Sequence, residues 1–279
     1  MGKSCNPFIE NIFLLRSQSA SDGVAVCKFQ FARKKRIAAR NRSFYNFLQQ
    51  SLERHGWERK MLQTIDPAIL YFGTPVLLVS SVNEDGSANL APMSSAWWLG
   101  NRCMLGFGAR SKTPQNIIRT GECVLNLPSD SLVDFVDRLA LTTGSDPVPP
   151  HKIEKGYRHV KDKFGQSGFT AITSESVAAQ RVAECPVQME ATLVQAHALE
   201  LDNPERQGTL VGLEVCVRRV HIDNSILMEG HNNRIDPDLW RPLIMSFQQF
   251  YGLGPRLQPS TLATIPEEMY RIKRSLLPG

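Results

Sequence analysis

The stretch Thr74-Pro-Val-Leu-Leu-Val-Ser-Ser-Val-Asn-Glu-Asp-Gly-Ser-Ala-Asn-Leu-Ala-Pro-Met-Ser-Ser-Ala-Trp-Trp98 sets the predicted fold. Residues 75–82 are rich in β-branched residues, which is typical of a strand. The turn Asn83-Glu84-Asp85-Gly86 follows, because Asp-Gly between two apolar runs is a strong hairpin signal. Residues 87–98 then return as a second strand, in which Pro92 favours an edge or a bulge.

Further strands are predicted along the chain, at residues 103–108, 122–127, 187–198 and 208–222. A short helix is predicted over residues 113–120, and Gly121 ends it. Many short antiparallel strands with turns between them favour a β-barrel core with helical additions. No βα alternation suggests a doubly wound sheet.

Residues 129–186 interrupt the strands and are predicted to be a helical insertion. Apolar side chains recur at helical spacing in residues 131–140, and a second helix is predicted over residues 152–164. We expect this insertion to form a lid or wall of a site. A C-terminal helical segment is predicted near residues 238–250.

The composition indicates an ordinary globular protein, with 42% hydrophobic and 21% charged residues in a chain of 279. No apolar run approaches the ~18 residues that suggest a membrane span, so we expect no membrane partner. The six cysteines form no Cys-x-x-Cys pair. Free thiols in a reducing compartment are the simplest interpretation, and we therefore expect a cytoplasmic protein.

The basic character of the chain lies at its front. Residues 1–60 carry a net charge of +8, whereas the remaining 219 residues sum to −3. A uniformly basic nucleic-acid binder would look different, so a nucleic-acid partner is not expected. The block Arg33-Lys34-Lys35-Arg36 could contact nucleic acid or acidic lipid, or residues 1–60 could be a disordered extension. Our hypothesis is that Met61 is the functional start and that residues 61–279 form one domain.

The stretch Gly106-Phe-Gly-Ala-Arg-Ser-Lys-Thr-Pro-Gln-Asn116 combines the features of a phosphate cradle. Glycines at the end of a strand let a ligand approach the backbone. Pro114 fits a first helical position with Thr113 as the N-cap, and a helix start presents free N–H groups. Cations and hydroxyls alternate just before it: Arg110, Ser111, Lys112 and Thr113. The alternative is a solvated turn with a well-capped helix.

A polar strand precedes this cradle. It places an amide and hydroxyls next to aromatic side chains, namely Asn89, Ser94, Ser95, Trp97 and Trp98. Such a strand could hydrogen-bond a planar heterocycle while aromatic rings cover it. The alternative is that Trp97 and Trp98 point to opposite faces of the sheet and that one of them is simply core.

These motifs, taken in order, resemble the flavin reductase-like family of FMN-binding split β-barrel proteins, over roughly residues 70–255. The matching residues are Asp85-Gly86, Asn89, Pro92, Ser94, Lys112-Thr113, Asn116-Ile117, Gly121-Glu122 and Val124-Leu125-Asn126. Two later patches also match, Pro186-Val187-Gln188-Met189-Glu190 and Phe250-Tyr251-Gly252.

The resemblance implies a Greek-key antiparallel split barrel that binds FMN at the interface of a homodimer. It assigns the flavin ring to Asn89, Ser94, Ser95, Ala96 and Trp97, and it places Tyr251 nearby. It assigns the phosphate to Arg110, Ser111, Lys112 and Thr113, next to Asn116.

The function implied by this resemblance is hydride transfer from NADH or NADPH to the flavin, without any side-chain nucleophile. A monooxygenase component is a possible electron acceptor. The alternative is a protein that carries flavin, or haem, without turnover.

Some polar residues fall outside this scheme. His221 and Asp223 could be a base with its orienting carboxylate or half of a metal site, although a histidine at a strand end beside a turn aspartate is common. His151 and His159 in the insertion are candidates for contact with nicotinamide or substrate. We interpret Cys103 and Cys123 as small core residues.

Overall fold

The computed structural model describes residues 62–270 of the chain. The basic extension of residues 1–60 and the proposed start at Met61 lie outside the described residues. The chain divides after Asp66, and all elements named below belong to the second unit, Pro67–Gly279. No helix within the described residues is long and apolar enough to cross a bilayer.

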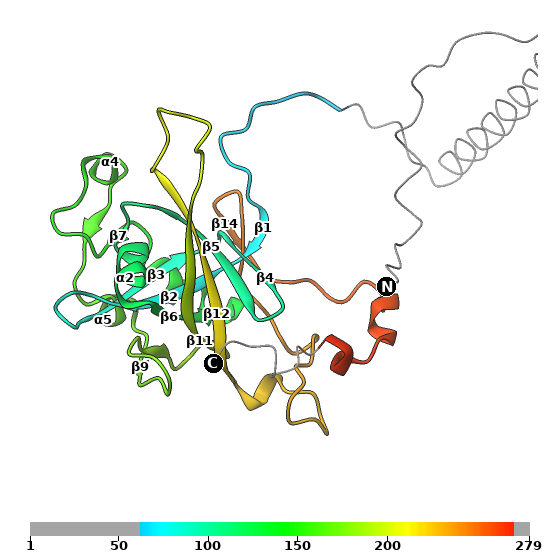
Figure 1. Cartoon of the computed structure of the whole chain (residues 1–279). Coiled ribbons are helices and arrows are strands. Elements are labelled where there is room, and N and C mark those ends of the chain that lie inside the picture. Colours follow the sequence, from blue (N-terminus) through cyan, green and yellow to red (C-terminus); the bar gives the residue numbers. More distant parts are fainter. Residues whose placement is uncertain (1–61, 271–279) are drawn as a thin grey trace, which may run out of the picture. The chain divides into compact units, whose positions relative to one another are not determined.

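Seven antiparallel strands form the main sheet, in the order β3-β2-β6-β11-β12-β5-β4 (Figure 1). Their bounds are β2 Leu77–Val82, β3 Ala88–Met93, β4 Ala96–Leu99, β5 Arg102–Gly108, β6 Glu122–Leu127, β11 Val187–Ala198 and β12 Leu210–Ile222. Helix α2, Lys112–Thr120, connects β5 to β6. The predicted mainly β fold with an antiparallel barrel core is confirmed.

The hairpin predicted from Asp85-Gly86 forms at that position. Strands β2 and β3 pair from Leu77 opposite Met93 to Val82 opposite Ala88. Gly86 turns the chain with a φ of 81°, a conformation that glycine adopts without steric cost.

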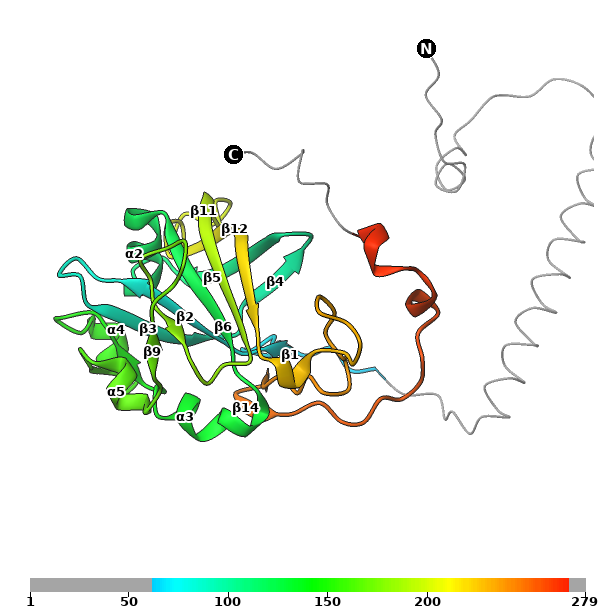
Figure 2. The same cartoon turned by 90° about the horizontal axis from the view of Figure 1, so that it is seen from below.

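The predicted single strand over residues 87–98 is in fact two strands, β3 and β4, separated by Ser94 and Ser95. These two strands lie at opposite ends of the sheet order. From Met93 to Ala96 the chain spans only about 11 Å even when fully extended. The sheet must therefore curl until its edges approach each other, as the curved strands in Figure 2 show. The Gly106 N–H donates to the Ser95 carbonyl across this junction at 2.7 Å.

Alternation along the strands divides the apolar core in two. Leu77 and Val79 of β2 pack into the interior of the curled sheet with Leu105, Leu125 and Leu213. The intervening residue Leu78 points to the other face, because successive strand residues face opposite sides. There it joins a second cluster built largely from the insertion, with Val136, Leu139, Phe164 and Val182.

The insertion consists of short pieces. They are η1 Asp130–Leu132, α3 Val133–Asp137, β7 Thr142–Thr143, α4 Pro150–Ile153, β8 Arg158–His159, α5 Lys163–Ser167, β9 Ala171–Ile172 and β10 Arg181–Val182. The prediction of one helix over residues 152–164 is therefore wrong. Gly156 has a φ of 80°, which ends α4, and β8 then pairs in parallel with β7.

The predicted helix near residues 238–250 is also wrong. Strands β13, Ile244–Ser246, and β14, Gln249–Tyr251, form a hairpin there, and β13 pairs with β1, Phe72–Pro75. Phe247 and Gln248 make the turn with positive φ angles of 45° and 64°. Helical turns occur elsewhere, in the short 3-10 segments η2 Asn224–Ile226, η3 Thr261–Thr264 and η4 Glu267–Tyr270.

Candidate functional site

A pocket of about 220 Å³ opens where the main sheet meets the insertion. Strand β3, the start of α2 and the short elements of the insertion gather around it on one side of the barrel (Figure 1). Its polar lining comprises Asn89, Ser111, Lys112, Thr113, Thr142, Thr143, Lys152, Tyr157 and Lys163. Within the described part of the chain, none of the residues that line this pocket is Asp or Glu. The pocket therefore suits an anion.

The start of α2 forms one wall of this pocket, as the local sequence predicts, but with a different cap. The N-cap is Ser111, in an extended conformation, rather than Thr113. Pro114 consequently occupies the third helical position and is buried. The cap and first residues of this nine-residue helix, Ser111 to Thr113, line the pocket, and a helix start of this kind stabilises a negative charge.

Asn89 holds the helix start in place. Its side chain is 1% exposed, and its Nδ2 donates to Thr113 Oγ1 at 3.0 Å and to Ser81 Oγ at 3.2 Å. Asn89 and Thr113 thus form a fixed floor for the pocket.

The two predicted cations of the cradle differ in their surroundings. Lys112 lines the pocket, and its Nζ lies 2.7 Å from Glu84 Oε2. Arg110 is exposed and lies outside the pocket lining. The cradle predicted from the sequence is therefore only partly gathered, with Ser111, Lys112 and Thr113 together and Arg110 apart.

Asn116 lies inside the protein instead of at the pocket. It is fully buried, and its Nδ2 donates to Asn83 Oδ1 at 2.9 Å and to Ser81 Oγ at 3.2 Å. These bonds tie α2 to the β2–β3 hairpin. Its Oδ1 has no hydrogen-bond partner among residues 62–270.

The predicted ring contacts lie along the junction between β3 and β4. Ser94 is half-buried, Ser95 Oγ lies 2.7 Å from the Tyr71 hydroxyl, and Ala96 is buried in the barrel core. Trp98 packs against the same core, whereas Trp97 on the opposite face is 57% exposed.

Tyr251, also assigned to the flavin by resemblance, is 55% exposed at the end of β14. It stands opposite Ile244 in the hairpin register. The ring contacts from Ser94 to Trp97 and Tyr251 lie outside the lining of the pocket, so the structure does not gather them with the phosphate cradle in one cavity.

Two lysines of the insertion, which the sequence did not single out, complete the pocket. Lys152 Nζ lies 3.4 Å from both Ser111 Oγ and Thr143 Oγ1. Lys163, the first residue of α5, also lines the pocket, although it is only 3% exposed. Burial, together with the smaller effect of the neighbouring Lys152, lowers the pKa of Lys163 to about 8. Burial also lowers the pKa of Lys152.

A second pocket, of about 270 Å³, adjoins the first through Lys112 and Gly144. It contains the carboxylates Glu84, Asp85 and Asp146 beside Lys161 and His159. This mixture of charges does not favour an anion. The first pocket is therefore the better candidate for a phosphate group.

His221, Cys103 and Cys123 have structural surroundings. His221 Nε2 lies 2.8 Å from Glu190 Oε1, whereas the Asp223 carboxylate accepts from the Ser225 N–H at 2.8 Å. The pairing of His221 with Asp223 that the sequence suggested is thus absent. No metal-binding cluster occurs among residues 62–270. Cys103 and Cys123 are buried core residues, and burial raises the pKa of the Cys103 thiol to about 12.

The remaining candidates of the insertion lie on its surface. His151 in α4 is exposed, and His159 Nδ1 lies 3.2 Å from the Ser145 carbonyl. His159 lines the second pocket and not the first.

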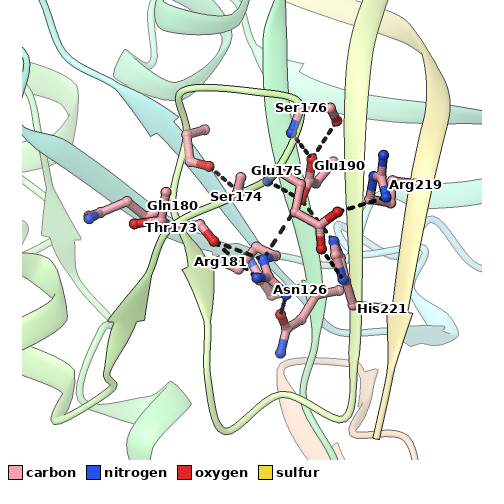
Figure 3. A network of polar contacts seen from close by, with 12 residues as sticks. Asn126, Thr173, Ser174, Glu175, Ser176, Gln180, Arg181, Glu190, Arg219 and His221 are labelled. Carbon is pink, nitrogen blue, oxygen red and sulfur yellow. Dashed lines mark hydrogen bonds and ion pairs between the residues drawn. The ribbon is translucent and has the colours of Figure 1, made fainter.

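Figure 3 shows a polar network that lies between the loop before β10 and strands β11 and β12. Its centre is Glu190, whose side chain is fully buried. The carboxylate accepts from the Glu175 N–H at 2.8 Å, from the Ser176 N–H at 2.6 Å and from the Ser176 hydroxyl. With His221 as a further donor, the network fastens the end of the insertion to the barrel.

A family model described as the flavin reductase like domain matches residues 69–251 of the chain. The uncharacterized protein YdfE of Bacillus subtilis (strain 168) is 35% identical over 197 residues, which cover 71% of this chain and 92% of that protein.

Two solved structures share the fold. Flavoredoxin of Desulfovibrio vulgaris (Miyazaki F) aligns with a TM-score of 0.58 and 20% identity over 74% of this chain and 100% of its own. Nitrilotriacetate monooxygenase component B from Bacillus cereus aligns with a TM-score of 0.57 and 22% identity over 72% of this chain and 100% of its own.

Proposed function

Because the chain belongs to the family of flavin reductase like domains, we propose that it is an FMN-binding oxidoreductase of the flavin reductase type. When bound, the flavin supplies the redox chemistry, accepting a hydride from NADH or NADPH, and the protein supplies binding and orientation. The observation that carries this proposal is the pocket at the start of α2, which combines lysines, hydroxyls and helix N–H groups without a carboxylate in its lining.

The donor set of this pocket fits a phosphate monoester. Ser111 and Thr113 offer hydroxyls, Lys112 offers an ammonium group, and the helix start offers N–H groups. Charge-assisted bonds from ammonium to phosphate are among the stronger hydrogen bonds in proteins. A pocket of about 220 Å³ is smaller than the roughly 300–1,000 Å³ of typical ligand sites. We therefore assign it to the phosphate end of the flavin alone.

The isoalloxazine ring is assigned to the polar strand that follows β3. Ser94, Ser95 and the backbone at Ala96 would bind its polar edge, and Trp97 would cover it. Ser95 is held by its hydrogen bond to Tyr71 and by the bond from Gly106 to its carbonyl. Fixed donors and acceptors of this kind orient a ring without any side-chain nucleophile.

A second copy of the chain would complete the site. Large apolar side chains are exposed on β4 and on the small β1–β13–β14 sheet: Phe72, Trp97, Leu99, Phe247 and Tyr251. We call these five side chains the apolar edge surface. Exposed apolar side chains from neighbouring elements are typical of an interaction surface. They support a homodimer with the flavin at its interface.

The electron acceptor is proposed from the name of a structural relative. A structural relative is named as a component of a nitrilotriacetate monooxygenase. A monooxygenase component is accordingly the partner that we would test first for this chain, in a reducing cytoplasmic setting.

The test of the proposed function is an anaerobic titration. The purified full chain is expected to bind FMN, and the flavin absorbance should bleach on addition of NADH or NADPH. Binding without bleaching would favour a flavin carrier that does not turn over. Failure to bind FMN, with no flavin absorbance after FMN addition, would contradict the proposal.

Substitution of the two cradle cations is expected to separate phosphate from ring binding. Lys112→Ala should weaken FMN binding about tenfold. A charge-assisted hydrogen bond contributes about 1.5–3 kcal/mol, and the effect is at the lower end because Lys112 also pairs with Glu84. Arg110→Ala should change FMN affinity less than about threefold, because Arg110 is exposed and exposed charges contribute little. Fluorescence titration with FMN and riboflavin measures both. Equal loss of both ligands on Lys112→Ala would show that the phosphate is elsewhere.

A further inference from the structure

The positive charge of the pocket is not balanced by the protein. Lys112 has its own carboxylate, Glu84, at 2.7 Å. Neither Lys152 nor Lys163 has an ion pair among residues 62–270, although both line the pocket. Lys163 is also without a side-chain hydrogen bond in this part of the chain, and its side chain is almost completely buried.

Nothing in the local fold accounts for this buried lysine. The adjacent carboxylate of Asp162 caps α5 by accepting from the Gly165 N–H at 2.8 Å, so it is engaged elsewhere. An unpaired buried ammonium group is costly, because it loses its hydration and gains no counter-charge. The nearby Lys152 increases this cost by repulsion, and both effects lower the pKa of Lys163. The simplest role for a buried ammonium group that the fold leaves unpaired is to bind an anionic ligand.

The position of the second lysine indicates where the ligand lies. Lys152 Nζ is 3.4 Å from Ser111 Oγ, the hydroxyl of the α2 N-cap, and 3.4 Å from Thr143 Oγ1 of the insertion. The insertion thus brings the Lys152 ammonium group, which has no carboxylate partner in this part of the chain, to the hydroxyl at the helix start, and Lys163 lines the same pocket.

We infer that the insertion supplies the main cations for the flavin phosphate, with Lys152 and Lys163 holding the dianion against Ser111 and Thr113. This inference rests on the proposed FMN function. It shifts the principal charge of the phosphate site from Arg110, which lies outside the pocket lining, to two lysines that line the pocket. It also makes the insertion a fixed wall of the binding site.

The test compares three methionine variants of the full chain. Lys163→Met and Lys152→Met each remove one ammonium group while keeping an unbranched side chain. Lys155→Met is the matched control, because Lys155 lies in the same segment and is exposed. Affinity for FMN and riboflavin is measured by titration. Thermal unfolding of the flavin-free protein is followed with and without inorganic phosphate.

Lys163→Met and Lys152→Met are each expected to weaken FMN binding roughly 10- to 100-fold, whereas the affinity for riboflavin should stay within about twofold of the wild type. The flavin-free Lys163→Met variant should unfold at an equal or higher temperature, because the substitution removes an unpaired buried charge. Inorganic phosphate should raise the unfolding temperature of the wild type but not of this variant. Lys155→Met should behave as the wild type.

Several results would overturn the inference. Equal loss of FMN and riboflavin, together with a lower unfolding temperature, would show a structural role for Lys163. Unchanged FMN affinity in both variants would remove the lysines from the phosphate site. If NADPH is titrated as well, weaker binding of NADPH with unchanged FMN affinity would remove the lysines from the flavin phosphate and assign them to the phosphates of the nicotinamide cofactor.

Failure of the proposed function would look different. If the wild type binds neither FMN nor riboflavin, flavin binding itself is contradicted. A phosphate-induced stabilisation that is present in the wild type and lost in Lys163→Met would still support an anion site built by the insertion. Its absence in the wild type would overturn that site as well.

Discussion

Replacing Glu190 by Ala is expected to lower the free energy of unfolding by about 3–5 kcal/mol, the range found when one partner of a buried charged network is removed. The carboxylate is fully buried and accepts hydrogen bonds from the Glu175 and Ser176 N–H groups and from His221 (Figure 3). Alanine would leave all of these donors unpaired. Urea unfolding followed by circular dichroism measures the loss.

The matched control is Glu175→Ala in the same network. The Glu175 side chain is 52% exposed, and its ion pair with Arg219 at 2.7 Å lies at the surface. Exposed ion pairs contribute less than about 1 kcal/mol, so a small effect is expected. FMN affinity of folded Glu190→Ala protein should equal that of the wild type, because Glu190 lies outside the pocket lining. An equal loss of stability in both variants would contradict the role of burial.

The stability of the folded protein is expected to depend on pH through the same carboxylate, that of Glu190. Burial alone would raise the pKa of Glu190, but the hydrogen bonds from Glu175, Ser176 and His221 outweigh it and lower the pKa from 4.5 to about 2. The charged form is therefore favoured in the folded state. Its contribution is complete above pH 4.5 and is lost as the pH falls toward 2. A Glu190→Gln variant should lose this part of the acid dependence.

The fold was predictable to the extent that local signals decided it. The hairpin at Asp85-Gly86 and strand β6 follow from turn chemistry and apolar runs, and both form as predicted. The break at Ser94 and Ser95 carries no local signal, because it results from closure of the sheet into a barrel. The turn at Phe247 and Gln248 requires positive φ from residues that rarely adopt it, so a helix was predicted there instead.

The candidate site also combines residues that are adjacent in the sequence with residues that only the fold brings together. Ser111, Lys112 and Thr113 are adjacent in sequence and lie together at the pocket. Lys152 comes from 41 positions beyond Ser111 and meets it only through the packing of the insertion. The lysines in the helix predicted over residues 152–164 give no sign that one of them will be buried. Their role emerges only once the short elements of the insertion are placed against β3 and α2.

Introducing charge on the apolar edge surface is expected to abolish the proposed homodimer. Trp97 and Leu99 are 57% and 73% exposed on β4, an edge strand of the main sheet. A stable interface buries about 1,200–2,000 Å² in total and depends on a few central residues, among which tryptophan is enriched. A Trp97→Glu, Leu99→Glu variant would place four carboxylates in the symmetric interface. Sedimentation equilibrium should then report a monomer where the wild type is a dimer.

The flavin measurement decides whether the dimer matters to the site. If two protomers share the flavin, as proposed, the monomeric variant should bind FMN at least about tenfold more weakly, because part of its contact surface is missing. Leu99→Glu alone tests assembly without changing a proposed ring contact.

The control is Ile118→Glu, since Ile118 is 50% exposed on α2 and away from the apolar edge surface, and it should leave both assembly and affinity unchanged. A monomeric wild type would contradict the dimer itself. A monomeric Leu99→Glu variant with wild-type FMN affinity would show that each chain holds its flavin alone, with the proposed phosphate ligands Lys152 and Lys163 of the same chain.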